Sequence, residues 1–199
     1  KSSLKTPYPA PVRPSPNARH LSLSFVLKRP WQATTNLTLS QPSGKSTAAD
    51  AAWVNGTLAH ALDFDDGGVA LTPMHPSAPV LPAVLALAEA RNLSGMEALS
   101  AYVVGVEVEC KLASLISLEH YGRGWHATAI LGTLGSALAS AGLLRLPPAK
   151  VRHALGIAAS MAGGLQSNFG TMTKPLHAGQ AARNGVVAAL LAEKGFTAN

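Results

Sequence analysis

The feature that most limits the fold is a helical pattern of apolar residues that begins near Ser46 and continues almost to the end of the chain. Apolar side chains recur three or four positions apart, which is the spacing of a helix with one buried face. In the third of six predicted helices these positions are Leu99, Tyr102, Val103, Val106 and Cys110. Six helices with short loops and no convincing strand predict an all-α fold, a multi-helix bundle.

Local signals predict where the six helices begin and end. The first covers about 48–62, and the second follows Pro79. The third opens with the capping box Ser94-Gly95-Met96-Glu97, in which Ser and Glu side chains each bind a free backbone N–H. The fourth covers about 126–143, the fifth 147–163 and the sixth 174–195. Gly132, Ser136 and Ser140 lie on one face of the fourth, so we expect another helix to approach that face closely.

Residues 1–43 differ from the remainder of the chain. They contain seven prolines, which interrupt any helical period, and residues 1–49 contain seven Lys or Arg and no acid. We therefore predict an irregular basic arm at 1–43 and a helical domain at 44–199. The net charge of +6 belongs to this arm rather than to a folded basic surface. Nucleic-acid binding is accordingly not expected.

The remaining composition indicates a large buried surface. Hydrophobic residues make up 47% of the chain and charged residues 13%, against a usual charged share of about 25%. Two uncharged runs, 127–144 and 153–173, approach the ~20 residues that span a bilayer. Both are rich in Gly, Ser, Thr and Ala, so we interpret them as buried helices and expect no membrane association. Cys110 is the only cysteine, which fits a reducing compartment such as the cytoplasm. Because the composition of the arm resembles a transit peptide, a mitochondrial location is the alternative if the protein is eukaryotic.

Two groups of charges oppose the dipoles of the predicted helices. Asp63, Asp65 and Asp66 follow the end of the first helix, and Lys174 lies at the start of the sixth. Each such charge costs roughly 0.3–1 kcal/mol at an exposed site. The aspartates are either a solvated loop or a cluster that orients a base or a substrate hydroxyl. Lys174 is either a surface residue or, with the free N–H groups of its helix, a carboxylate-binding group.

Histidines lie close to these charges in the sequence. His75 is in a proline-rich segment, His126 is in a predicted first turn that favours its neutral form, and His177 follows Lys174 by three residues. Each alone is compatible with a packing or surface role. Together with the misplaced charges they indicate an anion-binding site built at helix ends.

A divalent metal is the alternative explanation for the acidic group. Asp63, Asp65, Asp66 and His75 all carry groups that bind such ions. Beyond the aspartate run, however, no pair of them has a tight metal-type spacing. We therefore expect no metal.

The same residues carry a resemblance to a known family. Residues 55–66 (NGTLAHALDFDD), 75–77 (HPS) and 170–179 (GTMTKPLHAG) resemble the MmgE/PrpD family. That family includes 2-methylcitrate dehydratase, cis-aconitate decarboxylase and iminodisuccinate epimerase, and the resemblance covers about 44–199. It implies a large all-helical domain, a smaller α+β lid domain, a homodimer and no required metal or organic cofactor.

The resemblance also implies roles for individual residues. It places Asp63, His75, His126 and Lys174 in catalysis, and Lys174, His126 and His177 in binding a small carboxylate substrate. The expected function is a lyase of the 2-methylcitrate dehydratase type, which acts on a di- or tricarboxylate by proton abstraction and elimination. An isomerase or epimerase on the same scaffold, and a non-catalytic truncated dimerisation fragment, stay open as alternatives.

Some features depart from the family pattern. Gly67 stands where decarboxylase-type members carry Thr, the loop between Asp66 and His75 is longer, and Ala127 follows His126 where proline is common. These differences weigh against cis-aconitate as the substrate. Family members are also considerably longer than this chain. We therefore expect these 199 residues to be part of a longer protein and to exclude its lid domain.

Overall fold

The computed structural model describes residues 46–67 and 72–199, and this part of the chain is all-α, as predicted. Its elements are α2 (Ala48–Ala59), α3 (Ser77–Ala90), α4 (Gly95–Gly122), α5 (Ala127–Leu143), α6 (Pro148–Met161), the 3-10 helix η2 (Gln166–Asn168) and α7 (Thr173–Glu193). No helix of the described part combines enough length and apolar character to span a bilayer. The predicted arm at 1–43 lies outside the described residues.

The helix boundaries confirm most of the sequence-based ends. The capping box at the start of α4 is present, with the Ser94 N–H donating to Glu97 Oε2 at 2.9 Å and the Glu97 N–H donating to Ser94 Oγ at 3.3 Å. The predicted end of the first helix near Leu62 is wrong, because α2 ends at Ala59. His60 follows as its C-cap, and its side chain binds Asp65 instead of continuing the helix.

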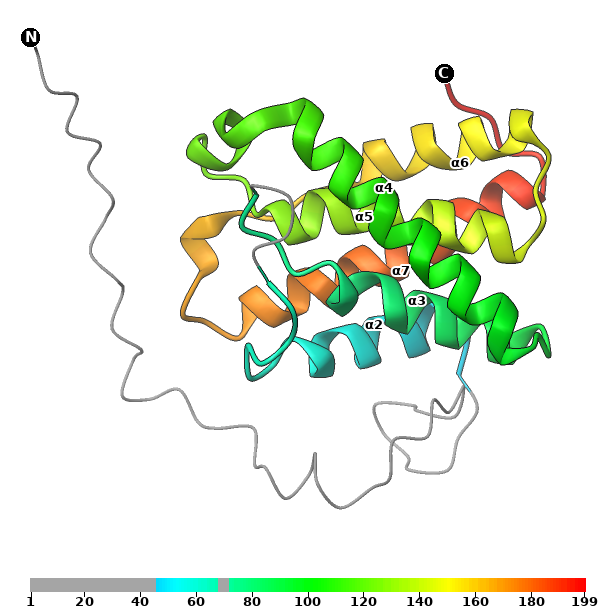
Figure 1. Cartoon of the computed structure of the whole chain (residues 1–199), viewed down its shortest axis with the longest axis horizontal. Helices are drawn as coiled ribbons and strands as arrows, with labels where there is room; N and C mark the ends of the chain where they lie inside the picture. Colours follow the sequence, from blue (N-terminus) through cyan, green and yellow to red (C-terminus); the bar gives the residue numbers. More distant parts are fainter. Residues whose placement is uncertain (1–45, 68–71) are drawn as a thin grey trace, which may run out of the picture.

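Two helices, α5 and α7, form the centre of the bundle (Figure 1). Helix α7 packs between α2 and α5, α3 packs on α2 and α5, α4 covers α5, and α6 packs on α5 and α7. The core of the described part consists largely of alanine, with valine, leucine, one isoleucine and one methionine. Small side chains allow the helix backbones to approach closely, so the core is filled by close backbone contact rather than by large side chains.

The closest helix contacts occur at glycines. A Cβ atom added to Gly56 of α2 would lie 2.8 Å from the Cα of Gly179 in α7. A Cβ added to Gly185 would lie 2.6 Å from the backbone nitrogen of Ala137 in α5. Gly132 of α5 similarly contacts Pro79 of α3. The predicted close approach along the Gly132 face is therefore confirmed.

This packing brings several helix ends together. The end of α2 and the starts of α3, α5 and α7 meet at one end of the bundle, at the left of Figure 1. The loops before α5 and α7 are joined there, since the His126 N–H donates to the Gly164 carbonyl at 3.0 Å. Gln166 Nε2 also donates to the carbonyl of Tyr121 at 2.6 Å and to that of Trp125 at 2.9 Å. Three interhelical loops thus converge on one surface.

We expect Gly179→Ala to destabilise the fold. Its Cβ would lie 2.9 Å from the Thr57 nitrogen and closer still to the Trp53 carbonyl oxygen, so α2 and α7 would have to separate. Overpacking of this kind costs about 1–3 kcal/mol in the free energy of unfolding, measured by urea denaturation. Gly142→Ala in α5 is the matched control, because nothing lies within 4 Å of its added Cβ. Equal stabilities of the two variants would contradict this view of the packing.

Candidate active site

An ion pair between Lys174 and Asp63 joins the start of α7 to the loop after α2. Lys174 Nζ lies 2.6 Å from each carboxylate oxygen of Asp63. Asp63 has a φ of 58°, a left-handed conformation that is uncommon for a residue other than glycine. The charge of Lys174 opposes the dipole of α7, and its pairing with Asp63, which lies beyond the end of α2, offsets that cost. The carboxylate of Asp63 is still 53% exposed, so this ion pair is open to solvent.

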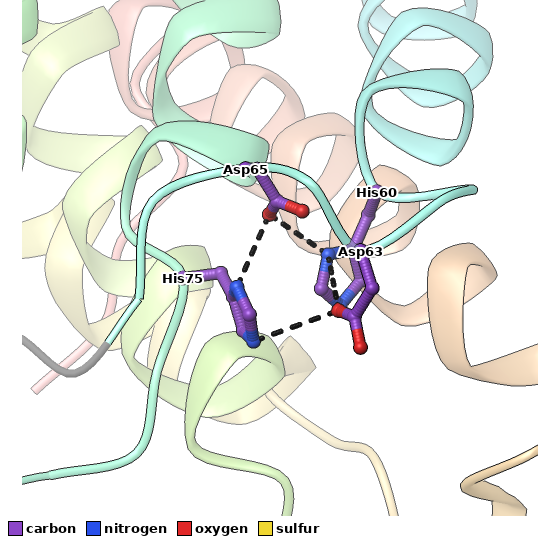
Figure 2. A group of neighbouring side chains, drawn as sticks. All are labelled: His60, Asp63, Asp65 and His75. Carbon is purple, nitrogen blue, oxygen red and sulfur yellow. Dashed lines mark hydrogen bonds and ion pairs between the residues drawn. The ribbon is translucent and has the colours of Figure 1, made fainter.

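Asp65 lies between two histidines (Figure 2). Its Oδ2 is 2.8 Å from His60 Nδ1 and 3.4 Å from His75 Nδ1. Burial raises the pKa of Asp65, but hydrogen bonds from His60 and His75 and the charge of His60 outweigh it and hold that pKa well below its usual range. Because an ionised carboxylate only accepts, His60 donates its Nδ1–H to Asp65. Asp65 therefore fixes the orientation of both rings.

His75 is held as a proton donor. Its hydrogen bond to Asp65 raises the pKa of the imidazole, against the opposing effects of burial and of Lys174, and the charges of Asp65 and Asp63 act in the same upward direction. The backbone N–H of His75 donates to Thr128 Oγ1 at 3.1 Å, which ties this loop to α5. A Cβ added to Gly67 would lie 3.4 Å from His75 Cε1, so residue 67 faces the ring.

His126 and His177 form a second, buried pair of imidazoles. Their Nδ1 atoms lie 3.1 Å apart, so one ring donates to the other. Burial, followed by the charges of His177, His60, Lys174 and His75, lowers the pKa of His126 to about 3. Burial and His60 also lower the pKa of His177. This lowered pKa agrees with the neutral state predicted for His126, with burial rather than the helix dipole as its main cause.

Phe169 connects the lysine to the histidine pair. The Phe169 ring meets His126 edge-on, with ring centroids 4.8 Å apart and an interplanar angle of 81°. Lys174 Nζ lies 5.4 Å from the centroid of the same ring, which is within cation–π distance. The ammonium is consequently held by an anion on one side and by an aromatic ring on another.

The structure brings together all five residues that the sequence placed in the site: Asp63, His75, His126, Lys174 and His177. His75 Nε2 is 3.7 Å from Asp63 Oδ1, and the rings of His60 and His126, 6.1 Å apart, link the two halves. Asp66 does not join them. It accepts from the Ser77 N–H at 3.2 Å and from Ser77 Oγ at 2.8 Å, and so stabilises the start of α3.

Sequence reasoning did not assign His60 or Phe169 to the site, whereas it named Asp65 in the acidic cluster that could orient a base. His60 and Asp63 are three positions apart but do not share a helix face, because the helix ends before His60. His60 therefore reaches Asp65, five residues away, at 2.8 Å and lies 3.7 Å from Asp63. For Phe169 the sequence contained no signal, because its role depends on the path of the loop between α6 and α7.

The acidic group also has the composition of a cation site. Ligand atoms of His60, Asp63, Asp65 and His75 all lie within 4.8 Å of one another, with His60 in the place that the sequence assigned to Asp66. In the observed arrangement, Lys174 supplies positive charge to Asp63 and the two histidines bind Asp65. The expectation that no metal is required stays a prediction, which elemental analysis of the purified protein tests.

We expect Asp65→Asn to reveal the charge state of His75 through the pH dependence of stability. Asp65 has a lowered pKa, so its contribution is present above its ordinary value of 3.8 and is lost as the pH falls. His75 has a raised pKa, so its contribution is present below 6.5 and is lost as the pH rises through the raised value.

The difference in melting temperature between the wild type and Asp65→Asn should therefore be largest between pH 3.8 and 6.5. It should shrink on either side of this window. The exposed residue Lys194, mutated to Gln, provides the control for loss of a charge and should show no such profile. A difference that stays constant with pH would contradict the coupling of Asp65 to His75.

Comparison with known proteins extends these observations. Human cis-aconitate decarboxylase is 42% identical over 164 residues, which cover 80% of this chain and 34% of that protein. Cis-aconitate decarboxylase of Aspergillus terreus is 37% identical over 155 residues, covering 74% of this chain and 31% of the relative. The cis-aconitate decarboxylase-like protein oryM of Aspergillus oryzae is also 37% identical, over 73% of this chain and 32% of its own length.

The chain thus spans about a third of the length of the curated relatives it matches. A family model supplies the assignment, because residues 20–199 match the MmgE/PrpD N-terminal domain. This match begins at residue 20, whereas the motifs alone indicated a start near Gly44. On the evidence of this match and these relatives, the chain belongs to the MmgE/PrpD family.

Proposed function

We propose that this chain forms the carboxylate-binding and proton-transferring part of a lyase that acts on a small di- or tricarboxylate. One observation carries the proposal: the Lys174 ammonium already binds a carboxylate, that of Asp63, through both oxygens at 2.6 Å. A substrate carboxylate could bind the Lys174 ammonium through both oxygens in the same way as the carboxylate of Asp63 does. Histidines with opposite pKa shifts lie beside it.

Lys174 is the group we assign to substrate binding. Its position in the first turn of α7 adds the free N–H groups of that helix to the charge of the ammonium. Phe169 lies against the ammonium and reduces its contact with water. Because Asp63 is half exposed, an incoming carboxylate can bind Lys174 beside Asp63 or in its place. His126 and His177 complete the proposed binding surface.

The different surroundings of the two histidines support assigning the role of general acid to one and that of general base to the other. His75 has a raised pKa and can donate a proton, whereas His126, with a pKa of about 3, is neutral and can accept one. Environments that shift two groups in opposite directions are typical of acid–base pairs in enzymes. Catalysis by such groups contributes about 10²–10⁴-fold each to the rate.

The motifs and the relatives favour different reactions of this class. In the dehydration expected from the motifs, a base such as His126 removes a C–H proton and hydroxide leaves as water with a proton from His75. In a decarboxylation, a C–C bond breaks, carbon dioxide leaves, and the remaining electron pair accepts a proton from His75. The names of the relatives favour decarboxylation of cis-aconitate. Gly67, which faces His75, marks where substrate contacts differ from those of members with Thr.

Apolar side chains surround the charged centre. Phe64 is 90% exposed between Asp63 and Asp65, and Met172, Trp125 and Leu165 are exposed on the loops that carry Lys174 and His126. Exposed apolar groups around a polar centre are typical of a surface that another element covers. This supports the lid expected from the family resemblance, and it predicts that the complete protein is needed for turnover.

In the complete protein we expect Lys174→Ala to lower kcat/KM by about 10²-fold or more, because loss of a paired, largely buried charge is costly. Steady-state kinetics measure the effect. Lys194→Ala, at the exposed C-terminal end of α7, is the matched control and should retain normal activity. Normal turnover by Lys174→Ala would refute the assigned role.

A screen of the complete protein against cis-aconitate, 2-methylcitrate, citrate and iminodisuccinate should identify the reaction. Release of carbon dioxide is the expected product signal, whereas formation of an alkene with water indicates a dehydratase and stereochemical inversion indicates an epimerase. The 199-residue chain alone should show little or no activity. If the complete protein turned over none of these carboxylates, the non-catalytic alternative would gain support instead.

A further inference from the structure

His60 lies between the two halves of the site and is buried there. It follows the last turn of α2 as its C-cap, and its side chain is 0% exposed. The ring of His75 meets it edge-on with centroids 4.6 Å apart, and the ring of His126 lies nearly parallel to it at 6.1 Å. Because so enclosed a side chain offers no surface to a substrate, His60 can affect the reaction only through the residues that it contacts.

His60 and His75 share one oxygen of Asp65, as Figure 2 shows. Asp65 Oδ2 is 2.8 Å from Nδ1 of His60 but 3.4 Å from Nδ1 of His75. Hydrogen bonds from a nitrogen to a carboxylate oxygen are about 2.7–2.9 Å long when they are strong. The bond from His60 has this length, whereas the contact of His75 is long and therefore weaker. His60 consequently takes the larger share of the negative charge on this oxygen.

The remaining polar atoms of His60 and Asp65 do not divide the two imidazoles between them. Oδ1 of Asp65 and Nε2 of His60 are buried and have no hydrogen-bond partner within the described part of the chain. The other carboxylate oxygen near His60, Asp63 Oδ1, is 3.7 Å from its Nδ1, which is beyond hydrogen-bond distance. The two imidazoles therefore compete for the same oxygen of Asp65 instead of binding one oxygen each.

We propose that His60 is a positioning residue that eases proton release by His75. By donating the shorter bond to Asp65 Oδ2, it draws the carboxylate away from His75 and loosens the hold of Asp65 on the proton of that ring. Without this donor, Asp65 would bind His75 alone, and protonated His75 would be a weaker acid. The proposal rests on the proposed function in one respect, the assignment of His75 as the proton donor.

Other titratable and charged groups also act on these two imidazoles. They come from the loop after α2, from the start of α5 and from α7: Asp63, His126, His177 and Lys174. Asp63 and Lys174 are paired with each other at 2.6 Å. Burial is the first cause of the lowered pKa values of His126 and His177, so these rings add no charge beside Asp65. A substitution of His60 therefore changes the donors on Asp65 and leaves these other groups in place.

Two variants separate the hydrogen-bond donor from the ring that carries it. His60→Phe keeps an aromatic ring against His75 and removes the donor. His60→Asn removes the ring and keeps an N–H donor, because the amide nitrogen of Asn and Nδ1 of His are the same number of bonds from the backbone. His60→Leu takes the place of His60→Phe if circular dichroism shows that the larger ring prevents folding.

The first experiment titrates His75 in the 199-residue chain without substrate, by NMR of the imidazole nitrogens. EDTA is present so that no metal ion competes for the ring, and His75→Gln identifies the signal. We expect the titration midpoint of His75 to rise by about one pH unit in His60→Phe, because its hydrogen bond to the charged Asp65 becomes stronger. His60→Asn should keep the wild-type midpoint.

The second experiment measures kcat and KM of the complete protein across pH. The alkaline fall of kcat, where His75 loses its proton, should move to higher pH in His60→Phe, and the plateau value of kcat should fall about 3- to 10-fold because the acid is weaker. KM should change little, because His60 does not contact the substrate, and His60→Asn should restore the wild-type profile. His153→Phe is the matched control, since His153 lies on α6 and its Nδ1 binds Ala198.

A titration midpoint of His75 that stays constant or falls in folded His60→Phe or His60→Leu overturns the proposal. A His60→Asn variant that behaves like His60→Phe also overturns it, because the ring rather than the donor would then matter. Neither result depends on catalysis. If the midpoint rises but kcat keeps its wild-type pH profile, the competition for Asp65 is supported, and the assignment of His75 as the proton donor, which belongs to the proposed function, is overturned.

Discussion

The close contact of α7 with α2 and α5 is the constraint on which the remainder of the structure depends. Gly179 and Gly185 leave no space for a side chain between these helices, so the axis of α7 is set by backbone contact. Because Lys174 is in the first turn of α7 and Asp63 follows α2, that contact also sets the distance between their charges. The helix packing and the site geometry therefore follow from the same small residues.

The periodic parts of the molecule could be predicted from the sequence, and the loop geometry could not. Apolar spacing and the Ser94–Glu97 capping box identified the helices, because these signals are local. The end of α2 depended on a side-chain contact between His60 and Asp65, which competes with helix continuation and has no periodic signature. The charge of Lys174 was informative because it opposes the dipole of α7 and so required another reason to be there.

Neighbouring histidines in this structure have pKa values shifted in opposite directions, and only their surroundings account for the difference. An ionised carboxylate beside His75 stabilises its protonated form, whereas burial of His126 beside His177 and near other positive groups disfavours it. Sequence motifs identified both residues, but only the arrangement of Asp65, His60 and Phe169 distinguishes them. Sequence reasoning did not assign two of them, His60 and Phe169, to the site, since each acts through a neighbour.

The contact between Lys174 and Asp63 joins residues 111 positions apart. Contacts between such distant segments form late, because the chain first has to meet the entropic cost of closing a long loop. A partly folded chain in which α7 has not docked contains every residue of the site and none of its geometry. Anion binding at Lys174 and Asp63 would therefore report on completion of the tertiary fold, rather than on the presence of helices.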